Sequence, residues 1–163
     1  MIGTYLSMNA WREMLTRVFV DVPAQDNVSP PWLVNPATKR RLKLDRWYPD
    51  LHVAIRFVGL MAKGVGRQSD EELRDSENRD ETRDELCRRN GVELVRIDAD
   101  GEEPVKQLEE LLRAISRAGR IIQESKLPSP DKSRWTTAVA RARANADDLR
   151  TLIQRNPEQM MAN

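Results

Sequence analysis

The sequence predicts an α/β fold in which a small central mixed sheet is flanked by helices. Residues 40–45 and 53–58 alternate apolar and polar side chains around a turn signal at residues 48–50, which is typical of two antiparallel strands. Residues 92–97 form a short apolar run, as expected of a buried third strand. Because helix signals precede, separate and follow these segments, the predicted order is helix, strand, strand, helix, strand, helix.

The composition excludes several classes of protein. The 163 residues are 39% hydrophobic and 33% charged, and they suffice for one domain with an appendage. No apolar run approaches the roughly 20 residues of a membrane span, and the first nine residues do not resemble a secretory signal. We therefore expect a cytoplasmic protein with no membrane partner. One cysteine and one histidine exclude a disulfide within the chain or a multi-thiolate zinc site, and they disfavour nucleophilic sites that need histidine.

The first 36 residues predict a helix followed by a proline-rich connector. After Asn9, which is a favoured N-cap residue, apolar side chains recur at helical spacing as far as residue 18 or 19. The prolines at positions 23, 30, 31 and 36 then interrupt the chain, so that neither a helix nor a central strand can persist there.

The two alternating segments predict a hairpin that brings opposite charges together. Leu42 and Leu44 fall on one face of the first strand, and Asp45 falls on the other. If the turn has an even number of residues, the residue numbers of each cross-strand pair add up to an odd number. Asp45 and Arg56 then lie opposite each other on the same face. The two side chains could then meet.

Residues 69–155 predict three further helices. A capping box at residues 69–72 starts a helix that should end near Asn90, and Gly91 should close it. Pro104 starts a strongly amphipathic helix, and a last helix is expected at residues 131–155. We expect a core at residues 37–120 and a C-terminal helical extension at 121–163. This extension could pack on the domain, on a second copy or protein partner, or against phosphates.

The helix after the capping box is unusually polar. One stripe along it combines apolar and charged side chains: Leu73, Glu77, Asp80, Arg83 and Cys87. Charges on a buried face are costly unless they have partners. Either the helix is mostly solvated, or the stripe belongs to a site.

Four sequence blocks occur in order between residues 44 and 97. They are DRWYPDL from Asp45, AIRFVG from Ala54, RDETRDELC from Arg79 and GVELVRI from Gly91. Together they resemble the D-F-Y-L-P-E-L, A-I-E-F-x-G, R-D-x-x-K-x-x-x-C and G-I-x-L-I-R-I pattern of PD-(D/E)XK nucleases, in the compact branch related to very-short-patch repair endonucleases. The blocks lie within about a third of the chain. The resemblance implies a restriction-endonuclease-like core.

The resemblance also implies a DNA endonuclease that uses Mg²⁺ or Mn²⁺ for phosphodiester hydrolysis. Such a site needs two or more acidic groups around a metal, and a lysine commonly assists. Asp45 and Asp80 match acidic positions, but Arg56 replaces the expected glutamate and Arg83 replaces the expected lysine. A guanidinium cannot ligate a cation. The candidate site therefore comprises Asp45, Arg56, Asp80 and Arg83, with Asp45 as the one retained metal ligand.

Three interpretations follow from these departures. In the first, the chain is a nucleic-acid-processing protein whose ancestral Mg²⁺-dependent hydrolysis is compromised, and Glu13, Glu72, Glu77 or Asp80 could rescue the site as a migrated second metal ligand. Alternatively, it is a non-catalytic DNA-binding or assembly subunit, in which Asp45 and Arg56 form a structural ion pair or Arg56 contacts a phosphate. The third interpretation is that Arg56 was introduced into an active enzyme.

The distribution of basic residues predicts DNA as a partner. The net charge of +1 gives no general attraction to nucleic acid, but the cations cluster. A solvated edge strand is the alternative interpretation of such a cluster. The residues expected to contact phosphates are Lys39, Arg40, Arg41, Lys43, Arg46, Lys63 and Arg67.

Overall fold

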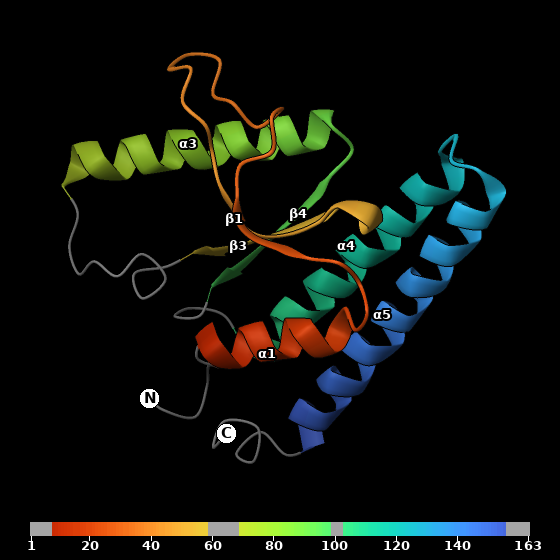
Figure 1. The fold of residues 1–163 in the computed structure, drawn as a ribbon. Helices are drawn as coiled ribbons and strands as arrows, with labels where there is room; N and C mark the ends of the chain where they lie inside the picture. Colours follow the sequence, from red (N-terminus) through yellow and green to blue (C-terminus); the bar gives the residue numbers. More distant parts are fainter. Residues whose placement is uncertain (1–7, 59–68, 99–102, 156–163) are drawn as a thin grey trace.

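The protein folds as a mixed four-stranded sheet with helices on both faces. The computed structural model describes residues 8–58, 69–98 and 103–155. In chain order the elements are α1 (Met8–Val18), β1 (Gln25–Val28), β2 (Leu44–Tyr48), the short 3-10 helix η1 (Pro49–Leu51), β3 (Val53–Val58), α3 (Asp70–Arg89), β4 (Glu93–Asp98), α4 (Pro104–Glu124) and α5 (Ser129–Arg155). Figure 1 shows α3 on one face of the sheet and α1, α4 and α5 on the other.

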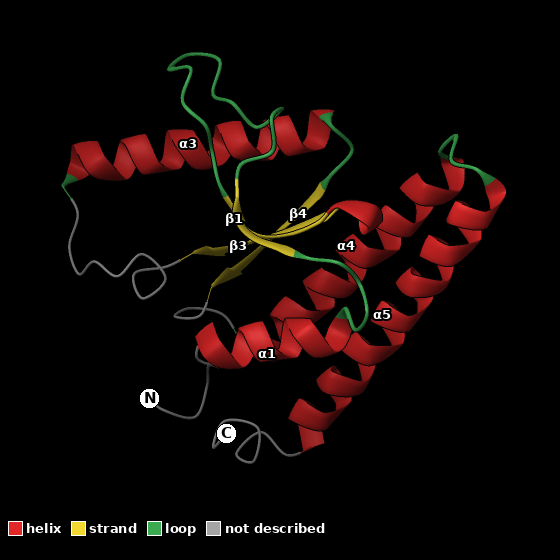
Figure 2. Cartoon of the chain, in the orientation of Figure 1, coloured by secondary structure: helices red, strands yellow, loops and turns green. Residues whose placement is uncertain are grey.

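The strand order in the sheet is β1-β2-β3-β4. The β1–β2 and β2–β3 pairs are antiparallel, whereas β3 and β4 are parallel and are joined through α3. Figure 2 shows the sheet between the two helical layers. The prediction of an α/β fold with a small mixed sheet is confirmed.

One strand of the sheet was not predicted. β1 lies in the segment that was expected to be only a proline-rich connector, and it pairs with β2. It fits between Pro23 and Pro30 because it is an edge strand, where prolines at the ends interrupt no central ladder. The predicted sheet of a hairpin and one further strand was therefore one strand too small.

The predicted hairpin begins later than expected, but its register is as predicted. β2 starts at Leu44 instead of Arg40, although Leu42 and Leu44 are both buried as the alternation indicated. η1 and one residue in the left-handed conformation, His52 with φ 59°, connect the two strands. Tyr48 therefore pairs with Val53, which gives the even turn and odd sum that the prediction assumed.

The predicted helices are also present, with small differences at their ends. α1 begins at Met8, so Asn9 lies within its first turn and is not its N-cap. The Ser69 side chain caps α3 by accepting the Glu72 backbone N–H at 3.1 Å. Gly91 follows α3 with φ 68°, a conformation that costs glycine little.

Two hydrophobic clusters hold the layers together. The larger one joins α1, α4 and α5 to one face of the sheet, with Trp11, Ile55, Leu111 and Ile115 fully buried. The smaller one lies on the α3 side and contains Leu33 at 0% exposure. Burial of each large apolar side chain contributes roughly 1.5–3 kcal/mol to folding.

The last helix packs on the domain, which was one of the three positions left open. α5 contributes Val139, Ala142 and Ala146 to the larger cluster, together with residues of α1 and α4. The close approach of α4 and α5 occurs at Gly119, where an added Cβ would lie 3.0 Å from Cγ1 of Val139. Within the ranges described above, no helix is long and apolar enough to cross a membrane.

Candidate functional site

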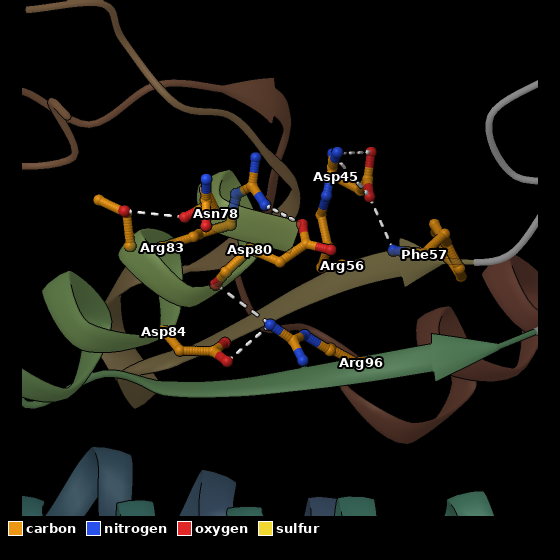
Figure 3. Close-up of polar contacts among 9 residues, drawn as sticks. Asp45, Arg56, Phe57, Asn78, Asp80, Arg83, Asp84 and Arg96 are labelled. Atoms are coloured by element: carbon orange, nitrogen blue, oxygen red, sulfur yellow. Dashed lines mark hydrogen bonds and ion pairs between the residues drawn. The ribbon is translucent and has the colours of Figure 1, made fainter. Parts of the chain in front are cut away.

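The predicted meeting of Asp45 and Arg56 across the hairpin is confirmed. Arg46 pairs with Ile55, and this register places Asp45 opposite Arg56. Nη1 of Arg56 lies 3.3 Å from Oδ2 and 3.4 Å from Oδ1 of Asp45. The backbone N–H of Phe57 also donates to Oδ2 of Asp45 at 2.7 Å (Figure 3). Both carboxylate oxygens of Asp45 are therefore occupied by donors from β3.

Arg83 and Asp80 bring a second ion pair to the same place from α3. Arg83 is only 4% exposed, and its Nη1 donates to Oδ1 of Asp80 at 2.8 Å. Burial lowers the pKa of the Arg83 guanidinium, and the positive charge of Arg56 lowers it further, whereas Asp80 and Asp45 oppose this change. Figure 3 shows the two ion pairs next to each other. The structure thus brings the four predicted site residues together.

A third arginine extends the ion pairs along the sheet. Arg96 of β4 is the register partner of Arg56 on β3. Its Nη2 donates to Oδ2 of Asp84 at 2.6 Å and to the backbone carbonyl of Asp80 at 3.1 Å, both on α3 (Figure 3). Burial raises the pKa of the Asp84 carboxyl, and the charge of Arg96 opposes that rise. Arg96 therefore fixes α3 to the sheet at a second point.

Six charged side chains thus form one assembly between the sheet and α3, which we call the arginine–aspartate network. Its members are Asp45, Arg56, Asp80, Arg83, Asp84 and Arg96. Three guanidinium groups face three carboxylates, so the network is balanced in charge. Nε of Arg56 and Nε of Arg83 are buried, and neither has a hydrogen-bond partner in the part of the chain that the structure describes.

These residues do not fit a divalent metal ion. A magnesium or manganese site needs several free oxygen ligands, but those of Asp45 face Arg56 and the Phe57 N–H, and Asp80 accepts from Arg83. A fixed positive charge 3.3 Å from Asp45 also repels a cation from that place. Among the described residues, no group of three or more His, Cys, Asp or Glu side chains is arranged to hold a metal.

The acidic residues considered as replacement ligands lie elsewhere. Glu13 is on α1, on the opposite side of the sheet from α3, and it pairs with Arg17 at 3.9 Å. Glu72 and Glu77 are exposed on the N-terminal half of α3. The geometry therefore gives no support to a migrated metal ligand.

Sequence reasoning missed two members of the network, Asp84 and Arg96. One signal was present, because Arg96 is the single arginine of an otherwise mostly apolar predicted strand. Such a residue needs a partner nearby. That partner is Asp84, which comes from α3 and is brought close only by the packing of this helix on β4.

Four of the predicted phosphate-binding residues lie on one ordered loop between β1 and β2. Lys39, Arg40, Arg41 and Lys43 are all exposed, and none forms an ion pair with another described residue. We call residues 33–43 the basic hairpin, because the backbone N–H of Leu42 donates to Leu33 at 2.9 Å and that of Asn35 to Arg40 at 2.9 Å. Figure 1 shows this loop on the α3 side of the sheet.

Buried apolar side chains attach the basic hairpin to the rest of the fold. Leu33 and Leu42 are buried in the smaller cluster, where they join Cys87 of α3 and Trp47 of β2. Residues 41–44 alternate exposed and buried side chains, which leaves Arg41 on the solvent side, opposite the leucines. The hairpin therefore presents its cations from a base that is packed against the core.

The remaining predicted phosphate contacts differ from these four. Nε of Arg46 pairs with Asp26 at 2.8 Å, and Nη1 of Arg46 donates to the Arg12 carbonyl at 3.2 Å and to Oγ1 of Thr16 at 3.3 Å. Arg46 thus joins β1 and β2 to α1, and it is not an unpaired cation of the surface. Lys63 and Arg67 lie outside the described residues.

Comparison of the chain with family models, curated proteins and solved structures finds no match. Its function is therefore inferred from the geometry of the network and of the basic hairpin.

Proposed function

We propose that this protein binds the phosphate backbone of DNA through the basic hairpin and does not cut it. In this proposal the fold is of the nuclease-like kind, and the arginine–aspartate network takes the place of the metal site. The observation that carries it is the ion pair between Asp45 and Arg56, at 3.3 Å.

The absence of cleavage follows from the charge that faces Asp45. Hydrolysis by this kind of site requires a metal to hold a phosphate oxygen and to lower the pKa of an attacking water. Arg56 supplies a permanent positive charge but no lone pair, and Arg83 cannot act as a base for the same reason. The geometry instead supports a structural role, because buried ion pairs with good geometry fix one arrangement of the elements that carry them.

Binding is supported by the composition of the basic hairpin and by its packing on the core. It presents four cations within five residues, from Lys39 to Lys43, and they have no acidic partner among the described residues. Release of condensed counterions by such cations supplies most of the affinity for a phosphate backbone. Because Leu33 and the cross-strand hydrogen bonds already order the loop, binding requires little further ordering.

The order of the four sequence blocks supports the nuclease-like assignment. The two hairpin blocks lie on β2, η1 and β3, the helix block on α3 and the last block on β4, and the residues at the four site positions converge. Convergence of Asp45, Arg56, Asp80 and Arg83 is what the resemblance requires of an ancestral site.

The binding experiment measures fluorescence anisotropy of a labelled DNA duplex over a series of salt concentrations. Lys39→Ala/Lys43→Ala is compared with Lys106→Ala/Lys126→Ala, which removes two exposed lysines outside the basic hairpin. We expect the hairpin variant to lower the slope of log K against log salt by up to about 2, because each lost contact contributes about 0.9. The control should leave the slope unchanged. Equal effects in the two variants, or no binding at low salt, would overturn the proposal.

The cleavage experiment incubates the same duplex with Mg²⁺ or Mn²⁺. The native chain should leave the duplex intact at concentrations that bind it fully. Cleavage by the native chain that is lost in Asp45→Ala would show a working nuclease and would sink the non-catalytic assignment.

A further inference from the structure

A second charged feature lies on the other side of the sheet, between α4 and α5. An open groove of about 700 Å³ lies along the surface where these two helices meet, and both helices line it. Three of the residues that line it are apolar and of small or moderate size, namely Leu112, Ala140 and Ala144. The two alanines leave space that a larger apolar side chain could fill.

Arginines dominate the charge of this groove. Arg113, Arg117, Arg120 and Arg143 line it, against Asp147 as the one carboxylate of the lining. Arg113 and Arg117 pair with glutamates nearby, and Asp147 pairs with Arg150. Arg120 and Arg143 are exposed and form no ion pair within the described ranges. The groove therefore favours an occupant that carries negative charge.

The N-terminal half of α3 has the complementary properties. Residues 70–81 contain seven carboxylates and two arginines. Leu73 is 43% exposed there, one of four large apolar side chains with substantial exposure in the described part of the chain. Asp70 and Glu77, three residues before and four after it, lie on the same side of the helix as Leu73.

The two surfaces cannot meet within one molecule. Figure 1 shows α3 on one face of the sheet and the α4–α5 pair on the opposite face. A contact between them can therefore form only between two copies of the chain. It would join different surfaces of the two copies, which produces a ring or an open chain of molecules.

We propose that the α4–α5 groove receives the N-terminal half of α3 from a second copy of this protein. Leu73 enters the groove beside Leu112 and the two alanines, and the flanking carboxylates face Arg120 and Arg143. The apolar side chain anchors the contact, while the charges set its orientation and its sensitivity to salt. This inference is independent of the proposed DNA binding, which uses the basic hairpin.

The test is sedimentation velocity of the full chain at low and high salt, with two charge-reversed variants. The groove variant is Arg120→Glu/Arg143→Glu, and the helix variant is Asp70→Arg/Glu77→Arg. All four side chains are exposed, so both variants should fold, which circular dichroism checks. We expect the native chain to associate at low salt and to dissociate at high salt. Each variant alone should associate at least about tenfold more weakly. An equimolar mixture of the two should associate again, because their charges are complementary.

A matched control separates this proposal from the proposed function. Arg40→Glu/Arg41→Glu reverses two exposed arginines of the basic hairpin, and it should lose DNA binding while it keeps self-association. A native chain that stays monomeric at low salt would overturn the docking proposal, and so would a mixture of the two variants that does not associate. If groove reversal weakens DNA binding and reversal on α3 does not affect association, the groove binds nucleic acid and the proposal is wrong.

Discussion

Arg56 of β3 lies opposite Asp45 of β2, and its Nη1 is 3.3 Å from the Asp45 carboxylate. The side chains are 24% and 18% exposed, so neither charge is fully solvated and each depends on the other. A nuclease of the kind that the sequence resembles needs a second acid at the place of Arg56. In the proposed function, this pair therefore takes the place of the metal-binding acids.

Replacement of Arg56 should destabilise the fold in proportion to the charge left beside Asp45. Arg56→Gln removes the ion pair, and we expect a loss of about 1–2 kcal/mol in the free energy of unfolding, between values for surface and buried pairs. Arg56→Glu should cost more, because two carboxylates then face each other. Urea unfolding at neutral pH measures both. Equal stability of all three proteins would contradict a structural role for the pair.

Arg83 should couple energetically to Asp80. Arg83 is 4% exposed and donates to Asp80 at 2.8 Å, so Arg83→Met should cost about 2–3 kcal/mol through the loss of a buried pair. In the double variant Arg83→Met/Asp80→Asn the unpaired carboxylate is also gone, so the two effects should be less than additive. A double-mutant cycle from urea unfolding tests this, and additive losses would contradict the contact.

Packing beneath the basic hairpin should affect DNA binding without any change in charge. Leu33 is fully buried, so Leu33→Ala should cost about 2–5 kcal/mol of stability. The loosened hairpin must then be ordered on binding, and we expect severalfold weaker affinity for duplex DNA, measured where the variant remains folded. Leu111→Ala, in the other cluster, is a matched control that should lose stability but keep the affinity.

Stability should fall at alkaline pH. Burial raises the pKa of the Cys87 thiol to about 12 and that of the Tyr48 hydroxyl to about 12. The folded chain thus holds these protons more tightly than the unfolded chain, in which the pKa of the thiol is about 8.5. The resulting stability is fully present below that pH and is lost as the pH rises toward 12. Urea unfolding across this range should show the decline, and Cys87→Ala should reduce it.

Local signals predicted most of the fold. The capping residue Ser69, Gly91 and the apolar spacing of α4 each act within a few residues, and the corresponding elements are confirmed. The contact between Asp45 and Arg56 was also predictable, because a short turn alone determines the register of a hairpin. The part of the candidate site that the sequence could predict was thus the Asp45–Arg56 contact, because the hairpin determines its geometry.

Long-range packing accounts for what the sequence did not reveal. β1 consists of Gln25, Asp26, Asn27 and Val28, and this polar edge strand has no apolar alternation to reveal it. The contact between Arg96 and Asp84 forms only when α3 packs on β4. The position of α5 was likewise undetermined, because an apolar stripe looks the same whether its own domain or another molecule covers it.

Whether Arg56 occupies the place of a metal is tested most directly by isothermal titration of Mn²⁺ into the native chain and into Asp45→Asn. If Arg56 occupies the place of the metal, neither protein should bind the ion at this position, and the two titrations should be indistinguishable. Binding of one Mn²⁺ to the native chain that disappears in Asp45→Asn would show a functional metal site, and would contradict the account of a network held by arginines.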